Sequence, residues 1–588
     1  MRLQHTLVLF VAVAFSVFAQ DKNVPSVGER LAAQNALFDE QYESDLREFP
    51  ERATNFGDYR YNDKLEDHSL AATLQREKIN QTFLARLQAI STVGFSDQDQ
   101  LSHDVLARGL QQRVADFELK EYEMPINQFN GVHTALADLP NSVPFDSVKQ
   151  YEDYVARLHQ IPGVLSQTTE VLRTGMKDKL MPVRFLLEKI PVQCQGIIDA
   201  NPFLNPTKKY AANITAEDQK RLTQQITDAI NVEVLPAYKA FAEFIRSEYA
   251  PQGRSTLSVT SLPDGEKRYQ NNIYSRTTTH MTADEIHQLG LREIDRIQAE
   301  MLAIAKKEGF ADLAAFRASL KTNPKYIATS AEQILDDFRR YIAQMQPKLP
   351  ELFTVLPQSP VTVEAIPVFQ AATATHYVAG TPDGKRPGRV VVATSNFAER
   401  SLVNDEAIAY HEGIPGHHMQ LSIQRQLTGL PKFRLQGLGF TAFVEGWALY
   451  SEQLGKEIGF YRDPISDYGR LSSELFRAVR LVVDTGIHSK GWTRDQVVEF
   501  MRKSGAVDEP TIQSEADRYI AWPAQACSYK IGQLKFLELR ARARRALGPK
   551  FDIRTFHDEM LNGGSLPLDL LEARTDKWIA EQKVASNR

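Results

Sequence analysis

The chain has 588 residues, of which 43% are hydrophobic and 24% charged, a composition typical of globular proteins that excludes disordered and collagen-like chains. Its 69 basic and 74 acidic residues nearly cancel, so the charge gives no reason to expect nucleic acid or an anionic membrane as a partner. With 13 histidines and only 2 cysteines, a metal site has to be built from histidine and carboxylate ligands, and a large disulfide framework is excluded.

The N-terminus is typical of a secretory signal peptide. Arg2 precedes an apolar run over residues 6–18, which is shorter than the roughly 20 residues that a membrane span needs. We expect a signal peptide at residues 1–19, cleaved after Ala19, and a periplasmic or secreted protein. No later segment is apolar over a sufficient length to predict a membrane span.

Most of the chain carries the three- and four-residue spacing of apolar side chains that is typical of amphipathic helices. In contrast, Met124–Phe145 is irregular and rich in Pro and Asn, as expected of a long ordered loop. Thr282, followed by Glu285 three residues later, predicts a capping box at the start of a long helix. The helical runs include Val27–Arg113, Val148–Met176 and Ala216–Tyr249.

Strand signals are few and lie close together in the sequence. The clearest candidates are Val361–Phe369, Ala374–Val378 and Arg389–Ala393, and a Gly- and Pro-rich turn separates the last two. They predict a small sheet or hairpin just upstream of the candidate site.

Because no repeat, low-complexity tract or flexible linker divides the chain, we expect one continuous, mainly α-helical body. A loose division near Pro360 separates a helical region, residues 20–360, from the region that holds the candidate site, residues 361–588. Export would permit a disulfide between Cys194 and Cys527, although two separate buried thiols fit the sequence as well.

Four side chains able to bind a metal or assist its chemistry lie within eight residues: His411, Glu412, His417 and His418. In the zinc-hydrolase pattern H-E-x-x-H, two histidines four residues apart share one helix face, and the glutamate acts on the bound water. Here the second histidine follows the first by six residues, which turns it about 120° away on a straight helix. His418 returns to the first face but lies about 10 Å along the axis, too far to share one ion.

The intervening segment Gly413–Gly416 supplies a break. In a continuous helix Pro415 clashes with the carbonyl of residue 411, and the two glycines permit backbone conformations that other residues resist. A bulge of two residues brings His417 to the effective i+4 position, whereas a bulge of three selects His418. We favour His417 as the second ligand, which leaves His418 either to contact the substrate or to contact the residues that hold the metal.

Four segments of the chain carry a resemblance to a known family: HEGIPGHHMQ, FVEGWALYSEQLG, VDTGIHSKGW and PAQACSYKIG. In them the chain resembles the bacterial family catalogued as domain of unknown function 885, which is grouped with zincin-like metallopeptidases. The resemblance covers most of the chain and is specific over roughly Gln370–Gly532. It implies a mostly helical, gluzincin-like body with a deep cleft and a metallopeptidase reaction class.

A catalytic zinc needs a further protein ligand, usually from a different helix. Glu445 lies in an apolar stretch, where a carboxylate is costly unless it is coordinated or paired, and the resemblance also points to it. We take Glu445 as the third ligand. Glu452, seven residues later and on nearly the same face, either orients a ligand histidine or is an exposed helix charge.

A polar stripe follows on the next helix. Arg477, Arg480, Asp484 and His488 fall within about 80° among Leu, Val and Ile residues. The stripe is either a buried ion-pair network or a wall of the cleft, and we favour the cleft. His488 is then placed to donate a hydrogen bond to a substrate carbonyl and Arg480 to contact the substrate, although the arginines and Asp484 could equally hold the scaffold.

Two neighbouring residues complete the set of candidates. Tyr529 resembles the tyrosine that stabilises the oxyanion in zincins of this broad type, and a core tyrosine is the alternative. Lys530 could pair with the terminal carboxylate of a peptide, or it could be a solvated charge.

Together these features predict a secreted peptidase acting on short peptides, in which two histidines and Glu445 hold Zn²⁺. Glu412 is the general base, and Tyr529 and His488 stabilise the oxyanion. A zinc hydrolase of a non-peptide amide and a non-catalytic helical binding protein are the alternatives, and the presence of Glu412 argues against the second. Exopeptidase or endopeptidase cleavage, the native metal and the oligomeric state stay open at this point.

Overall fold

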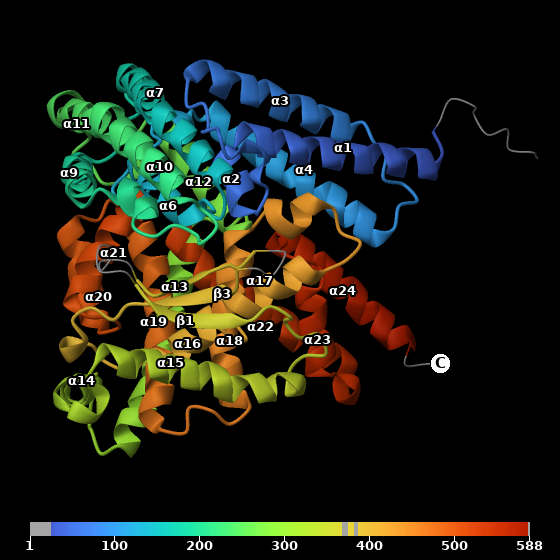
Figure 1. Cartoon of the computed structure of the whole chain (residues 1–588). Helices are drawn as coiled ribbons and strands as arrows, with labels where there is room; N and C mark the ends of the chain where they lie inside the picture. The colour runs from blue at the N-terminus through green and yellow to red at the C-terminus, as the bar shows by residue number, and fades with distance from the viewer. Residues whose placement is uncertain (1–24, 367–373, 382–385, 586–588) are drawn as a thin grey trace, which may run out of the picture.

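The computed structural model describes residues 25–366, 374–381 and 386–585, which form a mainly helical body with one small sheet (Figure 1). In this view the helices before position 280 occupy the upper part, and the later helices and the sheet occupy the lower part. Within the described ranges, no helix is both long and apolar enough to cross a membrane. The expected signal peptide, residues 1–19, lies outside them.

Up to position 280 the α-helices are α1 (Val27–Glu48), α2 (Pro50–Asn55), α3 (Leu70–Gln88), α4 (Asp97–Glu118), α5 (Val132–Ala137), α6 (Leu139–Ser142), α7 (Val148–Asp178), α8 (Arg184–Leu187), α9 (Ile190–Ala200), α10 (Ala216–Ala229), α11 (Leu235–Phe244) and α12 (Gly265–Thr277). After it they are α13 (Ala283–Lys307), α14 (Leu313–Thr322), α15 (Ala331–Met345), α16 (Asp405–Glu412), α17 (His417–Gln426), α18 (Thr441–Glu457), α19 (Pro464–His488), α20 (Arg494–Ser504), α21 (Glu509–Ala521), α22 (Ser528–Leu547), α23 (Ile553–Leu561) and α24 (Leu568–Ala585).

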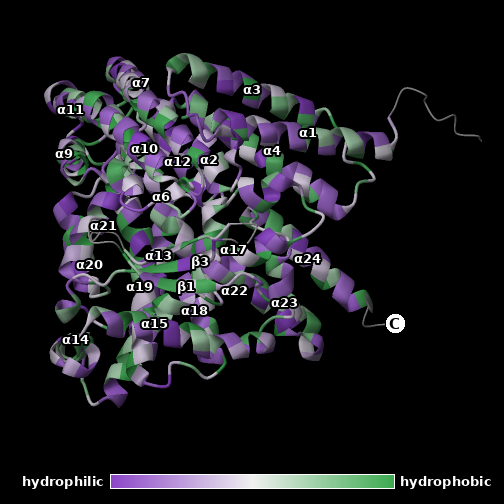
Figure 2. Cartoon of the chain, in the orientation of Figure 1, coloured by the Kyte–Doolittle hydropathy of each residue, from purple (hydrophilic) through white to green (hydrophobic). Residues whose placement is uncertain are grey.

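The helical periodicity of the sequence is confirmed along most of the chain. The capping box at the start of α13 is also present, with the Thr282 hydroxyl accepting from the Glu285 backbone and the Glu285 side chain accepting from the Thr282 backbone. The predicted loop Met124–Phe145 is partly wrong, because α5 and α6 form within it. Both are short, so neither offers enough turns for an apolar period to be recognised. Figure 2 shows hydrophilic and hydrophobic residues together on most helices, as expected where helices cover a core.

The predicted small sheet is confirmed and has three strands. β3 (Gly388–Val392) is central; β1 (Val361–Ala365) pairs with it in parallel, and β2 (His376–Val378) pairs with it antiparallel. β2 and β3 are therefore the hairpin that the turn signal indicated. Residues 367–373, the end of the first predicted strand and its continuation, lie outside the described residues.

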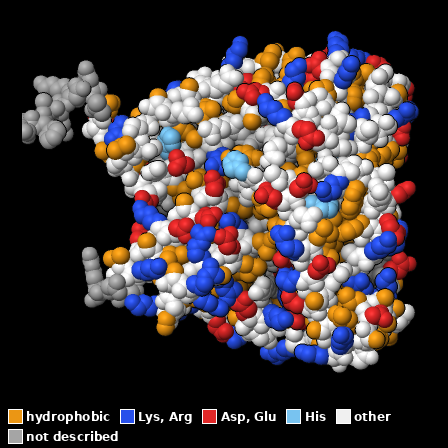
Figure 3. Space-filling model, turned by 180° about the vertical axis from the view of Figure 1, so that it is seen from behind, with side chains coloured by type: hydrophobic (Ala, Val, Ile, Leu, Met, Phe, Trp, Pro, Cys, Tyr) orange, Lys and Arg blue, Asp and Glu red, His pale blue; other side chains and the backbone are white. Residues whose placement is uncertain are grey.

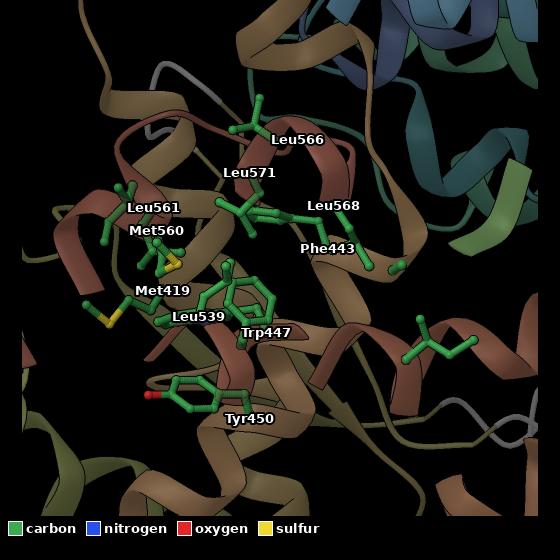
Figure 4. Packing of buried hydrophobic residues seen from close by; sticks show 14 of the residues in the cluster. Met419, Phe443, Trp447, Tyr450, Leu539, Met560, Leu561, Leu566, Leu568 and Leu571 are labelled. Carbon is green, nitrogen blue, oxygen red and sulfur yellow. The ribbon is translucent and has the colours of Figure 1, made fainter. Parts of the chain in front are cut away.

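Hydrophobic residues from both sides of position 360 share one core. The largest cluster of buried apolar side chains extends from Leu37 to Ile579. Figure 4 shows part of it. Phe443 and Trp447 of α18 both pack against Phe536 of α22, with ring centroids 5.4 and 5.5 Å apart. On the surface seen in Figure 3, charged side chains of both signs are interspersed with hydrophobic ones, in keeping with the near-neutral charge balance.

Both cysteines are buried free thiols. Cys194 lies in a cluster formed by residues between Leu65 and Ala250, whereas Cys527 belongs to the largest cluster. The disulfide is therefore wrong, and the alternative of two separate thiols is confirmed.

Helix α19 runs through the interior, where it packs against α13, α16, α20 and α22. From Tyr468 to His488 every residue of this helix is buried except Arg477. Because the surrounding helices enclose α19, a single partly exposed side chain in its middle marks the place where solvent reaches the interior.

Candidate metal centre

The break between the two candidate ligand histidines is built into the backbone. Helix α16 ends at Glu412, and α17 begins at His417. Across the break, the Gly416 N–H donates to the Tyr410 carbonyl at 3.0 Å. The indole N–H of Trp447 donates to the Pro415 carbonyl at 2.9 Å, which ties the break to α18.

Glycine is required at position 416. A Cβ there would lie 2.0 Å from the carbonyl oxygen of His411, so the start of α17 can approach the end of α16 only without a side chain. As a result the rings of His411 and His417 come together, with centroids 4.9 Å apart and planes at 90°. The predicted interruption is confirmed, and it brings the histidines together despite their six-residue spacing.

Glu445 of α18 completes a group of three donors. Its Oε2 lies 3.7 Å from Nε2 of His411 and 3.4 Å from Nε2 of His417. All three donor atoms lie within 4.8 Å of one another. Donors bound to one tetrahedral zinc at about 2.1 Å lie about 3.4 Å apart, so this set fits a zinc ion.

His418 does not join this group, which decides between the two histidines in favour of His417. Its Nε2 lies 3.0 Å from the Ser359 carbonyl, and its Nδ1 lies 3.0 Å from the Tyr377 hydroxyl of β2. The ring is buried. The expected contact of His418 with substrate is therefore wrong, since both nitrogens are used to attach α17 to the sheet and the segment before it.

Glu452 orients the first ligand. Its Oε1 lies 2.8 Å from Nδ1 of His411, so the hydrogen bond places the proton on Nδ1 and leaves Nε2 to face Glu445. Glu452 is buried, and the alternative of an exposed helix charge is wrong. Burial alone would disfavour the imidazolium, but the hydrogen bonds to Glu445 and Glu452 outweigh it and raise the pKa of His411 to about 9 in the metal-free protein.

Two further predicted residues lie at the centre. The Glu412 side chain, at the end of α16, has no hydrogen-bond or ion-pair partner in the described part of the chain and reaches solvent slightly, with the residue 9% exposed. The ring of Tyr529 lies nearly parallel to that of His411, with centroids 6.5 Å apart. Tyr529 is only partly buried, which disfavours the core-tyrosine alternative. Burial and the nearby Glu445 charge raise the pKa of its phenol.

A close helix crossing places Tyr529 beside Glu445. Gly446 of α18 and Gly532 of α22 face each other, and a Cβ on Gly532 would lie 1.9 Å from the Ala442 carbonyl oxygen. Only glycine permits this approach. Since Tyr529 lies one turn before Gly532 on its helix, and Glu445 directly precedes Gly446, the crossing fixes the two side chains relative to each other.

A family model described as "Bacterial protein of unknown function (DUF885)" matches residues 50–574. The chain belongs to the DUF885 family. No curated protein matches it.

Solved structures of two bacterial proteins share the fold. One is a protein of Colwellia psychrerythraea named as a candidate lipoprotein, which is 27% identical, with a TM-score of 0.88 over 94% of this chain and 99% of that one. The other, from Shewanella oneidensis, is named as a candidate lipoprotein of unknown function and is 18% identical, with a TM-score of 0.70 over the same shares of the two chains. The second likeness is one of fold alone.

In this member of the DUF885 family, His488 lies away from solvent. Its Nε2 donates to the Tyr519 carbonyl at 2.9 Å, and its Nδ1 accepts from the Val259 N–H at 3.1 Å. Burial lowers its pKa to about 3. The expectation that His488 stabilises an oxyanion is wrong, because both nitrogens are bonded to backbone groups. At this end the polar stripe is a buried network, in which Asp484 accepts from the Ala524 N–H and anchors the turn before α22.

Lys530 is fully buried and forms ion pairs with Glu293 at 2.9 Å and Glu474 at 2.7 Å. Its expected role in binding a terminal carboxylate is therefore wrong. Arg480 is also buried and pairs with Glu515 at 3.1 Å. Its guanidinium carbon lies 4.5 Å from the centre of the Tyr529 ring. Because Arg480 is buried against this ring and paired with Glu515, the direct substrate contact that we expected is wrong.

Sequence reasoning missed Arg518 of α21. Its Nη1 donates to Gln525 at 2.5 Å, and its charge acts on the Tyr529 phenol. No pattern in the sequence of α21 distinguishes this arginine from a solvated one, because its position depends on how α21 packs against α19.

Proposed function

We propose that the protein is a zinc-dependent hydrolase of peptide bonds with a zincin-like centre and cleft. The observation that carries this proposal is the convergence of Nε2 of His411, Nε2 of His417 and a Glu445 oxygen next to the unpaired carboxylate of Glu412. Two histidines and a glutamate are a ligand set of catalytic zinc sites, which keep one position open for water and substrate.

When bound, a zinc ion supplies Lewis acidity, lowering the pKa of a coordinated water to about 7 and polarising the substrate carbonyl. Glu412 accepts a proton from the attacking water, whose oxygen bonds to the carbonyl carbon. The carbon–nitrogen bond then breaks, and Glu412 passes the proton to the leaving amine.

Tyr529 donates a hydrogen bond to the oxygen on which negative charge develops. Burial raises the pKa of its phenol, so the hydroxyl keeps its proton at neutral pH. The ring of Tyr529 is nearly parallel to that of His411, with centroids 6.5 Å apart, and the Glu445 charge acts on its phenol, which supports this role.

A location outside the cytoplasm agrees with this activity. The sequence predicts a signal peptide, and the two structurally similar proteins are named as candidate lipoproteins, a class of exported proteins. We propose short peptides in the periplasm or surroundings as substrates.

Replacing Glu412 with Gln tests the proposal, because it removes the base and spares the ligands. We expect the variant to keep its zinc, measured by elemental analysis, while hydrolysis of a peptide library read by mass spectrometry falls at least about 100-fold. Glu499→Gln, an exposed change on α20, is the matched control. Undiminished hydrolysis by Glu412→Gln would show that the reaction uses another base, and hydrolysis of non-peptide amides alone would favour that substrate class.

A further inference from the structure

Three side chains near the centre, those of Arg477, Arg518 and Tyr529, are partly exposed to solvent. On α19 only Arg477 opens to it between Tyr468 and His488, with its side chain 13% exposed. From α21, the side chain of Arg518 is 12% exposed. Tyr529 lies between them: the Arg477 guanidinium carbon is 6.0 Å from its ring centre, and the charges of both arginines act on its phenol.

The three arginines near Tyr529 form ion pairs with only two carboxylates among the described residues. Glu515 is shared, pairing with Arg480 at 3.1 Å and with Arg518 at 2.7 Å. The carboxylate nearest to Arg477 is that of Glu452, at 3.8 Å, and it already accepts the hydrogen bond of a ligand histidine. Three guanidinium groups therefore share two carboxylates in their ion pairs, while Glu445 faces the histidines.

Arg477 carries the most clearly unused donor. Its Nη1 donates to Ser473, but its Nε is buried and has no hydrogen-bond partner in the described residues. A guanidinium with a buried, unpartnered Nε is costly in a largely desolvated site, and a planar carboxylate is the partner that matches its donors. Beside Arg477 a substrate ammonium group would be repelled by the guanidinium, because the carboxylates paired there, Glu515 and Glu452, are already engaged.

We propose that Arg477 binds the C-terminal carboxylate of the peptide substrate, so that cleavage occurs near the C-terminus, while Arg518, whose guanidinium is bonded to Glu515 and Gln525, adds positive charge nearby. This inference rests on the proposed peptidase function and makes the protein a carboxypeptidase-type enzyme. Arg480, behind the Tyr529 ring, adds positive charge without touching the substrate. The bond that breaks is the one whose carbonyl reaches the metal centre while Arg477 holds the terminal carboxylate.

The first test compares three N-acetylated peptides. Two share one sequence and end in a free acid or an amide, and the third is an amide of that sequence with its last residue changed to Glu. We expect kcat/KM for the free acid to exceed that for the plain amide by at least about 10-fold, mainly through KM, since hydrogen bonds to charged groups are strong. If the amide that ends in Glu were cleaved with the same kcat/KM as the free acid, any carboxylate would be recognised, and the assignment to the C-terminal carboxylate would be overturned. Equal cleavage of all three would overturn the arginine site but leave the peptidase function, whereas no cleavage of any peptide would overturn both.

The second test changes the arginine. In Arg477→Gln we expect the preference for free acid over amide to fall about 10- to 100-fold, and in Arg477→Lys to be partly kept, with zinc content unchanged in both. Arg502→Gln, an exposed change on α20, is the control. Calorimetric titration of the inactive Glu412→Gln protein with the free acid and the amide gives a readout independent of turnover. Tighter binding of the acid supports the inference, and equal binding contradicts it.

Discussion

The predicted metal ligands are held by bonds that bias their chemistry before any ion binds. His411 donates to Glu452 through Nδ1, so its Nε2 faces the position between His417 and Glu445. The second Glu452 oxygen is buried without a hydrogen-bond partner in the described residues, so this carboxylate makes its hydrogen bond to the ligand from a dry environment. A dry, charged partner strengthens the imidazole as a ligand.

Replacing Glu452 with Ala should therefore weaken metal binding by about 10- to 100-fold, because the ring loses its orienting partner. Replacement with Gln should have a smaller effect, since the amide oxygen can still accept the hydrogen bond. Competition with a chelator of known affinity measures both. Metal affinity unchanged in Glu452→Ala would show that packing alone orients His411.

At this scale the sequence predicted the ligands but not every neighbour. His411 and His417 are six residues apart with two glycines and a proline between them, so they could share one ion only if the helix was interrupted between them. For His488 the polar stripe was visible, and for Lys530 its place on a helix, but the environment of these side chains was not. A polar face on a wholly buried helix can meet solvent, charged side chains or backbone carbonyls, and periodicity is the same in all three cases.

At the scale of elements, the crossing of α18 and α22 positions Tyr529 relative to Glu445. The two helices approach so closely at Gly446 and Gly532 that a Cβ on the latter would overlap the Ala442 carbonyl. The crossing decides how far Tyr529 lies from the ligands. The sequence showed both glycines and both helices, but not that the glycines face each other, since pairing between helices distant in sequence is set by tertiary packing.

Gly532→Ala should destabilise the protein by about 1–3 kcal/mol, as expected for overpacking, and should lower activity while zinc is retained, because Tyr529 is displaced. Gly163→Ala in α7 is the matched control: it lies in a helix interior with nothing within 4 Å of its added Cβ, so it should be neutral or stabilising by up to about 1 kcal/mol. Chemical denaturation and peptide hydrolysis measure the two effects. Equal stability of both variants would contradict the role assigned to the crossing.

Over the whole molecule, several histidines are buried as neutral rings. Burial lowers the pKa of His133 to about 4 and those of His488 and His557 to about 3. Between these values and the usual 6.5, the unfolded chain binds protons that the folded protein does not. Their stabilising effect is therefore complete above pH 6.5 and is lost as the pH falls to about 4 for His133 and to about 3 for His488 and His557.

We expect the free energy of unfolding to decrease by roughly 1 kcal/mol per buried histidine for each pH unit below about 6. Urea unfolding at a series of pH values measures this slope. His557→Gln should make it shallower, whatever its effect at neutral pH, and His159→Gln, at an exposed position, is the control. A parallel slope in His557→Gln would show that other groups dominate acid unfolding.

Because the two cysteines lie in different buried clusters, they can serve as separate probes of local unfolding. Burial raises the pKa of the Cys194 thiol to about 12 and that of Cys527 well above its usual range, so neither forms an appreciable amount of thiolate at neutral pH. Each becomes reactive only when its own cluster opens. Alkylation rates of the two thiols, followed peptide by peptide, would thus report independently on the opening of two cores, using native residues as labels.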